Sequence, residues 1–203
     1  MSVKLHSEQI SKRLFISVLI IVMSLLCISI PLIVSQYQHY NKARQALIEI
    51  ESLKAVADLA NRISRERGPA NMAMSSTPEQ LKKNLADLQT YRDGVDQQIT
   101  ETFEILKQSG FDSLTGKMQS DLKNHLSIGR QYVDVYIDTP IEQRSAQKLD
   151  DAILHMFKAW DSSYVVLKSM VKQAASKDTG VADYYTLILI LADLRDQAGR
   201  LAS

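Results

Sequence analysis

Residues 14–34 read LFISVLIIVMSLLCISIPLIV, a run of 21 residues without a charged side chain. As an α-helix this run would rise about 30 Å, which matches the hydrocarbon thickness of a bilayer. The competing interpretation is a cleaved signal peptide, but apolar runs in signal peptides usually extend over about 7–15 residues. The sequence at the end of the run, Ile33-Val34-Ser35-Gln36, also offers no small-x-small cleavage site. The run therefore predicts an uncleaved transmembrane helix.

Charges on the two sides of this run predict its orientation. Three bases (Lys4, Lys12 and Arg13) and one acid (Glu8) precede it, whereas the bases that follow it are accompanied by acids. By the positive-inside rule the short N-terminal arm is cytoplasmic, and the rest of the chain lies outside the cytoplasm. We expect a single-pass protein of the bacterial inner membrane with three segments: a cytoplasmic arm (1–13), a transmembrane helix (14–35) and a periplasmic helical domain (36–203).

Composition excludes several other classes of protein. Lys and Arg total 24 against 23 Asp and Glu, a net charge of +1, and this balance argues against a nucleic-acid partner. Seven Gly and four Pro are too few for a turn-rich β-sandwich or a disordered chain. The single cysteine, Cys27, excludes internal disulfides and multi-cysteine metal sites. We expect no cofactor.

Beyond the apolar run, hydrophobic residues recur at the three- and four-residue spacing of a helix face. This periodicity predicts an all-α fold in which the transmembrane helix continues into an antiparallel bundle of four to five helices. The residues expected to face inward include Ile50, Leu53, Ala57, Ala60, Ile63, Leu81, Leu85, Leu88, Val95, Ile99, Leu106, Leu114, Met118, Leu122, Leu126, Val133, Leu149, Ile153, Met156, Trp160, Leu167, Val171, Tyr184, Ile188, Leu191 and Leu194.

Start and stop signals divide this periodicity into segments. Thr77 is a suitable N-cap, Pro78 suits the first helical position, and Gln80 would complete a capping box. Gly110 is placed to end that helix, and a third helix is expected from about Ser113. The remaining boundaries are a second Thr-Pro start at 139–140, a break at 177–180, and a fifth helix from Val181. This last helix has no stop signal before Ser203 and the sequence contains no output module, so we expect the segment to be the front part of a larger receptor or a remnant of one.

No catalytic motif is present. The four histidines show no paired ligand spacing, and the sequence has no glycine-rich phosphate loop, nucleophile elbow or His-Glu-x-x-His motif. We therefore expect that the segment is not an enzyme and that any catalytic module would lie beyond residue 203.

Two arginine clusters are the candidate ligand-binding residues. The first reads RISRERGPANM over 62–72, and in it Arg62 and Arg65 share a helix face while Gly68-Pro69 predicts a kink or a helix end. The second reads DLRDQAGRL over 193–201. Arginine forks bind planar oxyanions and carboxylates through paired hydrogen bonds. If the first and fifth helices are neighbours, the candidate ligand-binding residues are Arg62, Arg65, Arg67, Arg195 and Arg200.

A purely structural role for the same arginines is the alternative. The first cluster would complement the negative end of a helix that stops at Gly68. Glu66 and Asp58 could pair with Arg62, and Asp193 or Asp196 could neutralise the second cluster.

The inside arm, the span, the long helix with Arg65-Glu66-Arg67-Gly68 and the later Ala198-Gly199-Arg200 resemble the extracytoplasmic sensor region of bacterial transmembrane receptors. Such regions precede diguanylate cyclase, chemotaxis or histidine-kinase modules. Within that class the chain most resembles the nitrate- and nitrite-sensing (NIT-type) domain, whose motifs are an Arg-Glu-Arg-Gly-like and an Ala-Gly-x-x-Arg-like sequence.

That resemblance implies that Arg65 and Arg67 match the first motif and Arg200 the second, with nitrate or nitrite held by these side chains. Arg200 follows Gly199 directly, whereas the family places residues before its arginine, and the family domain is larger, with two stacked bundles. The expected function is a membrane-anchored sensor segment, homodimeric, that binds a small anion or a partner between long helices. The alternative is a membrane-anchored structural or adaptor bundle that docks another protein.

Overall fold

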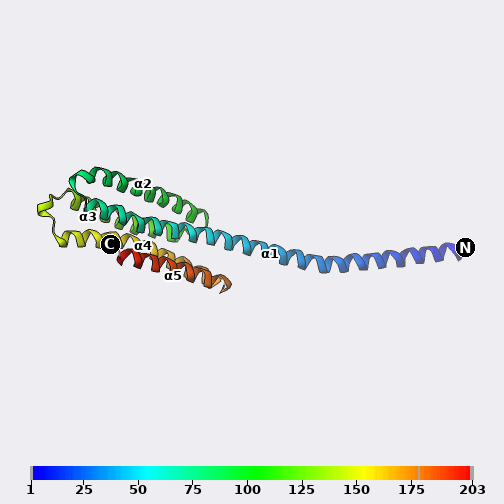
Figure 1. The fold of residues 1–203 in the computed structure, drawn as a ribbon. Helices are drawn as coiled ribbons and strands as arrows, with labels where there is room; N and C mark the ends of the chain where they lie inside the picture. Colours follow the sequence, from blue (N-terminus) through cyan, green and yellow to red (C-terminus); the bar gives the residue numbers. More distant parts are fainter. Residues whose placement is uncertain (1, 178, 202–203) are drawn as a thin grey trace. The chain divides into compact units, whose positions relative to one another are not determined.

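The computed structural model describes the backbone of residues 2–177 and 179–201 and the side-chain surroundings of residues 13–111, 115–116, 119–172 and 183–201. Within these residues the regular structure is helical and no strand occurs (Figure 1). The elements are α1 (Ser2–Met74), α2 (Pro78–Gln108), α3 (Asp112–Asp138), a short 3₁₀ turn η1 (Ile141–Gln143), α4 (Ala146–Lys177) and α5 (Thr179–Leu201). The prediction of an all-α fold is confirmed.

The chain forms two compact units, with the division between Leu47 and Ile48. The first unit contains the N-terminal part of α1, whose apolar side chains between Leu14 and Val34 are all exposed. By length and composition this is one helix, near the N-terminus, that is apolar enough to cross a membrane. Lys4, Glu8 and Lys12, on which the predicted orientation depends, lie outside the described side chains.

In the second unit α2 turns back along the C-terminal part of α1 (Figure 1). The Ser52 hydroxyl donates to the Ser109 hydroxyl at 2.7 Å, and the Arg62 guanidinium lies 3.5 Å from the carbonyl oxygen of Gly94. Residues later in α1 therefore meet residues earlier in α2, which makes the pair antiparallel. The α3–α4 contact is close at Gly129, where an added Cβ would lie 3.0 Å from the carbonyl oxygen of His155.

Two apolar clusters make up the core of this unit. The larger one includes Leu59 and Ile63 of α1, and the smaller one begins at Ala70 and Ala73, further along the same helix. Buried charged residues, Glu66 and Arg67, occupy the positions between them. Trp160, expected in the core, is 4% exposed and belongs to the larger cluster.

Two predicted boundaries are wrong, the starts of the fourth and fifth helices, and of the two interpretations of Gly68-Pro69 the helix end is not found. The first helix continues to Met74, because Ala70, Ala73 and Met74 are buried in the smaller cluster and that packing offsets the hydrogen bond that Pro69 cannot donate.

The Thr-Pro signal at 139–140 does not open the fourth helix. Pro140 precedes the turn η1, and α4 begins at Ala146. The Arg144 guanidinium donates to three main-chain carbonyls, those of Thr139, Ile137 and Met74, and so holds this connection against the ends of α1 and α3.

Thr77 is the N-cap of α2 and Pro78 its first residue, as predicted, but the capping box is wrong because the Thr77 side chain makes no capping hydrogen bond. The pKa of the Glu79 carboxyl instead lies below its usual value because the Thr77 side chain hydrogen-bonds to it.

The third helix begins one residue before the predicted Ser113, and the fifth begins at Thr179 rather than Val181. Asp178, Leu114 and Met118 lie outside the described residues or side chains.

Most predicted inward positions are buried, with a clear exception in α5. Tyr184, Leu191 and Leu194 are 71%, 57% and 61% exposed, whereas Tyr185 and Asp196 are buried. The predicted face is therefore wrong, because the packed side of α5 carries a charged residue that interrupts its apolar periodicity. Two further positions expected inward, Ile50 and Leu85, are also exposed.

Candidate functional site

The structure divides the five candidate arginines into two sets. Arg67 is buried and Arg200 partly buried, and both form salt bridges. Arg62, Arg65 and Arg195 are exposed. Helices α1 and α5 are neighbours, as the clusters required, because Arg67 on α1 lies 2.9 Å from Asp196 on α5.

Asp196 neutralises the buried set. Its side chain is fully buried, with one oxygen near Arg67 and the other accepting a hydrogen bond from Arg200. Arg200 also pairs with Asp161 on α4, and both guanidiniums lie over the ring of Phe157, 4.9 and 4.5 Å from its centroid. The alternative interpretation, in which Asp196 neutralises the second arginine cluster, is confirmed for Arg200.

Arg67 and Asp196 are not aligned for a hydrogen bond, although their atoms are within ion-pair distance. Asp196 Oδ1 and Arg67 Nη1 are both buried without a hydrogen-bond partner in the described part of the chain. Burial lowers the pKa of Arg67, and the nearby Arg200 lowers it further, against the attraction of Asp196. For Arg200, burial acts in the same direction, but hydrogen bonds to Asp196 and Asp161 outweigh it and raise the pKa.

A second buried ion cluster surrounds Glu66. Its two carboxylate oxygens accept hydrogen bonds from Arg130 of α3, both at 2.9 Å, and Arg92 of α2 lies 3.7 Å away. Arg130 also pairs with Asp96, and Arg92 with Asp134. Burial alone would lower the pKa of Arg130, but the hydrogen bonds and attraction of these carboxylates raise it.

Glu66 therefore pairs with arginines on other helices and not with Arg62. Sequence analysis missed Arg92 and Arg130 as partners of the first cluster. The i,i+4 spacings in the sequence, Arg92 with Asp96 and Arg130 with Asp134, would have indicated pairs within one helix. The ion pairs instead run between α2 and α3, Arg92 with Asp134 and Arg130 with Asp96, so the spacing gave no signal for them.

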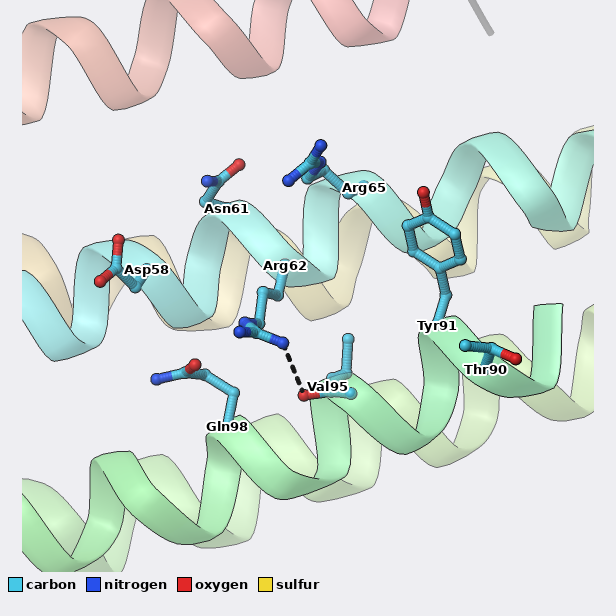
Figure 2. A pocket seen from close by; sticks show the side chains of 9 residues that line it. Asp58, Asn61, Arg62, Arg65, Thr90, Tyr91, Val95 and Gln98 are labelled. Atoms are coloured by element: carbon cyan, nitrogen blue, oxygen red, sulfur yellow. Dashed lines mark hydrogen bonds between the residues drawn. The ribbon is translucent and has the colours of Figure 1, made fainter. Parts of the chain in front are cut away.

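Two members of the exposed set, Arg62 and Arg65, border a cavity of about 460 Å³ between α1 and α2, which we name the α1–α2 groove (Figure 2). In Figure 2, Arg62 reaches toward α2, while Asp58, Asn61 and Arg65 follow one another along α1. Tyr91 and Gln98 extend from α2 toward α1. The groove is lined by Asp58, Asn61, Arg62, Arg65, Thr90, Tyr91, Gly94, Val95 and Gln98.

A second hollow of about 390 Å³ adjoins Arg65 on the side of α5, and we name it the α1–α5 hollow. Arg65 and Tyr91 line both cavities, and Arg195 of α5 joins them in the second. The residues that line the hollow include three arginines and no carboxylate: Ser64, Arg65, Arg67, Gly68, Pro69, Asn71, Tyr91, Arg195 and Gly199.

Charges in these two cavities are largely uncompensated. In the described part of the chain Asp58, Arg65 and Arg195 form no salt bridge, and the one polar contact of Arg62 is the long one to the Gly94 carbonyl. The side-chain oxygens of Asn61 and Asn71 are buried there without a hydrogen-bond partner. The arginines of this arrangement can donate several charged hydrogen bonds to an anion. The carboxylate of Asp58 and the side-chain oxygens of Asn61 and Asn71 can accept hydrogen bonds from a donor group next to that anion.

Metal chemistry has no candidate site among the described residues, where no group of three or more His, Cys, Asp or Glu side chains converges. His155 instead stacks on Tyr132, with ring centroids 4.1 Å apart. Burial and the nearby Lys158 lower the pKa of His155.

No family model, curated protein or solved structure matches this chain. The resemblance to NIT-type domains therefore stays a prediction that depends on the two arginine motifs.

Proposed function

We propose that this chain is a membrane-anchored, non-enzymatic sensor segment of a signalling receptor. It binds a small anion at Arg65, where the α1–α2 groove and the α1–α5 hollow meet. The observation that carries the proposal is the set of three exposed arginines, Arg62, Arg65 and Arg195, that border these cavities without salt-bridge partners in the described part of the chain.

The energetic argument concerns repulsion between like charges. Arg65 and Arg195 line the same hollow without a carboxylate in its wall, so an anion bound there would relieve their mutual repulsion. Apart from Tyr91 of α2, the hollow is lined by residues of α1 and α5, and its occupancy would favour a closer approach of these two helices. A ligand that binds one arrangement of these helices better than another shifts the population toward it.

In this proposal the signal travels along α1, which also contains the apolar run 14–34. The run crosses the bacterial inner membrane, residues 1–13 stay in the cytoplasm, and the helices beyond it form a periplasmic bundle. We further propose that the receptor acts as a homodimer, because one crossing helix in each chain needs a partner against which to move.

Thermal unfolding of the full chain in detergent micelles tests anion binding. Nitrate, nitrite and acetate are added as sodium salts at constant ionic strength, with chloride as the reference. A ligand at 100 times its Kd should add about 2.7 kcal/mol to the unfolding free energy. Arg65→Gln should remove the effect, and the matched control Lys83→Gln, an exposed base on α2, should keep it.

An equal response to all anions, or a response that survives Arg65→Gln, would overturn the binding site. Because Arg65 is exposed, its replacement is expected to leave the fold intact, and circular dichroism of the variant checks this.

One observation favours the alternative function, a membrane-anchored adaptor. The exposed side of α5 carries Tyr184, Leu187, Leu191, Leu194 and Leu201, all more than half exposed. Spacings of three, four and seven residues place them in one stripe, which is the pattern of a helix that packs against another helix. Loss of a bound partner in Leu187→Asp and Leu194→Asp variants, without any anion response, would support the adaptor.

A further inference from the structure

The α1–α2 groove is large for a simple inorganic anion. Its volume of about 460 Å³ lies within the range of roughly 300–1,000 Å³ that is usual for pockets of small organic molecules. A bare anion would contact only part of the wall and leave the remainder to water. The dimensions of the groove therefore favour an organic ligand.

Opposite charges lie at the two ends of the same wall. Asp58 precedes Arg65 by seven residues, which is two helical turns or about 10 Å along α1. Asn61 lies between them, and its buried side-chain oxygen has no hydrogen-bond partner in the described part of the chain. Acceptors gather toward Asp58, and charged donors gather toward Arg65.

The intrahelical pair that would cancel this separation does not form. Asp58 and Arg62 have the i,i+4 spacing of a helix ion pair, but the guanidinium of Arg62 turns toward α2 and contacts the Gly94 carbonyl (Figure 2). Asp58 is thus left with its charge directed to solvent at the rim of the groove.

We propose that the ligand of the groove is a small organic zwitterion, which carries a carboxylate and an ammonium group. The carboxylate would accept hydrogen bonds from Arg65 and Arg62, and the ammonium would donate to the Asp58 carboxylate and to Asn61 Oδ1. This inference rests on the proposed function, and it names the chemical class of the ligand bound beside Arg65.

Four probes test the charged groups of the ligand separately and together. Acetate carries only the carboxylate, methylammonium carries only the ammonium group, and glycine and 4-aminobutanoate carry both. Each is added to the full chain in micelles, and affinity is obtained from the concentration dependence of thermal unfolding. At least one of the two zwitterions should bind about tenfold more tightly than acetate or methylammonium.

A variant of Asp58, at the acidic end of the groove, shows whether the ammonium group of the ligand is recognised. Asp58→Asn should weaken zwitterion binding about tenfold and leave acetate binding within about twofold. Asp87→Asn is the matched control, because Asp87 is an exposed carboxylate on α2 that lines neither cavity, and it should change nothing. Arg65→Gln should weaken binding of both acetate and the zwitterion.

The possible results separate the two proposals. Arg65-dependent acetate or nitrate binding with no gain for either zwitterion would overturn the zwitterion and leave the anion site standing. Zwitterion binding that is unchanged in Asp58→Asn would also overturn it. If no probe binds, both proposals are wrong.

Discussion

Replacing Asp196 by alanine should be among the most destabilising single changes in the second unit. The Asp196 side chain is fully buried and is the nearest counter-charge of buried Arg67, which is 3% exposed. Removing one partner of a buried ion pair leaves an uncompensated charge, which typically costs about 3–5 kcal/mol. Because burial already lowers the pKa of Arg67 with Asp196 present, the unpaired guanidinium would be strongly disfavoured.

The consequence for thermal unfolding follows from chain size. For a domain of this size each 1 kcal/mol corresponds to roughly 2–4 °C, so Asp196→Ala should lower the unfolding temperature by about 6–20 °C. Arg200 should contribute less to this loss, since it is partly exposed and keeps Asp161 as a partner. The matched control Asp183→Asn replaces an exposed carboxylate of the same helix and should shift the temperature by no more than about 2 °C.

A double variant separates the charge from the packing. Replacing both partners by apolar residues of similar volume, Arg67→Met with Asp196→Leu, should recover most of the lost stability. Urea unfolding of the full chain, followed by circular dichroism, gives both free energies. A loss below about 1 kcal/mol in Asp196→Ala, or a double variant as unstable as the single one, would refute the argument.

Three further predictions concern packing, pH and the second ion cluster. Gly129→Ala should destabilise by about 1–3 kcal/mol in urea unfolding, because the added Cβ meets the main chain of α4; no loss would mean that the helices separate freely. The pKa of His155 is lowered, so the unfolded chain binds more protons and stability should fall as pH drops below about 6.5; His155→Gln should flatten this dependence in unfolding titrations between pH 5 and 8. Glu66→Gln should destabilise by about 1–3 kcal/mol in urea unfolding, since Arg130 loses a charged acceptor on α1, and an unchanged midpoint would contradict that role.

Apolar periodicity predicted the helices well where tertiary packing is apolar. Leu88, Val95, Leu122 and Leu167 are buried as expected. A regular stripe of large apolar side chains on one helix face is removed from water only when that face packs against another helix. In α5 the same reasoning selected the wrong side. The buried positions there include Asp196, whose burial depends on Arg67 of another helix as well as on Arg200 of α5 itself.

The arginine clusters show a similar limit. The motifs identified residues near the groove, and the condition set for the site, that the first and fifth helices are neighbours, is met at Arg67 and Asp196. The internal ion pairs of these clusters depend on partners from other helices. Arg200 pairs with Asp161 of α4, and Glu66 of the first cluster pairs with Arg130 of α3. Sequence spacing within one helix cannot supply that information.

Labelling of an engineered cysteine tests most directly the claim that the helical domain lies outside the cytoplasm. In a Cys27→Ser background, Asp87→Cys places one thiol at an exposed position of α2. A membrane-impermeant maleimide applied to intact spheroplasts should label it fully, with a cytoplasmic cysteine protein left unlabelled in the same sample. Labelling of this thiol only after lysis would contradict the proposed topology and the sensor function that depends on it.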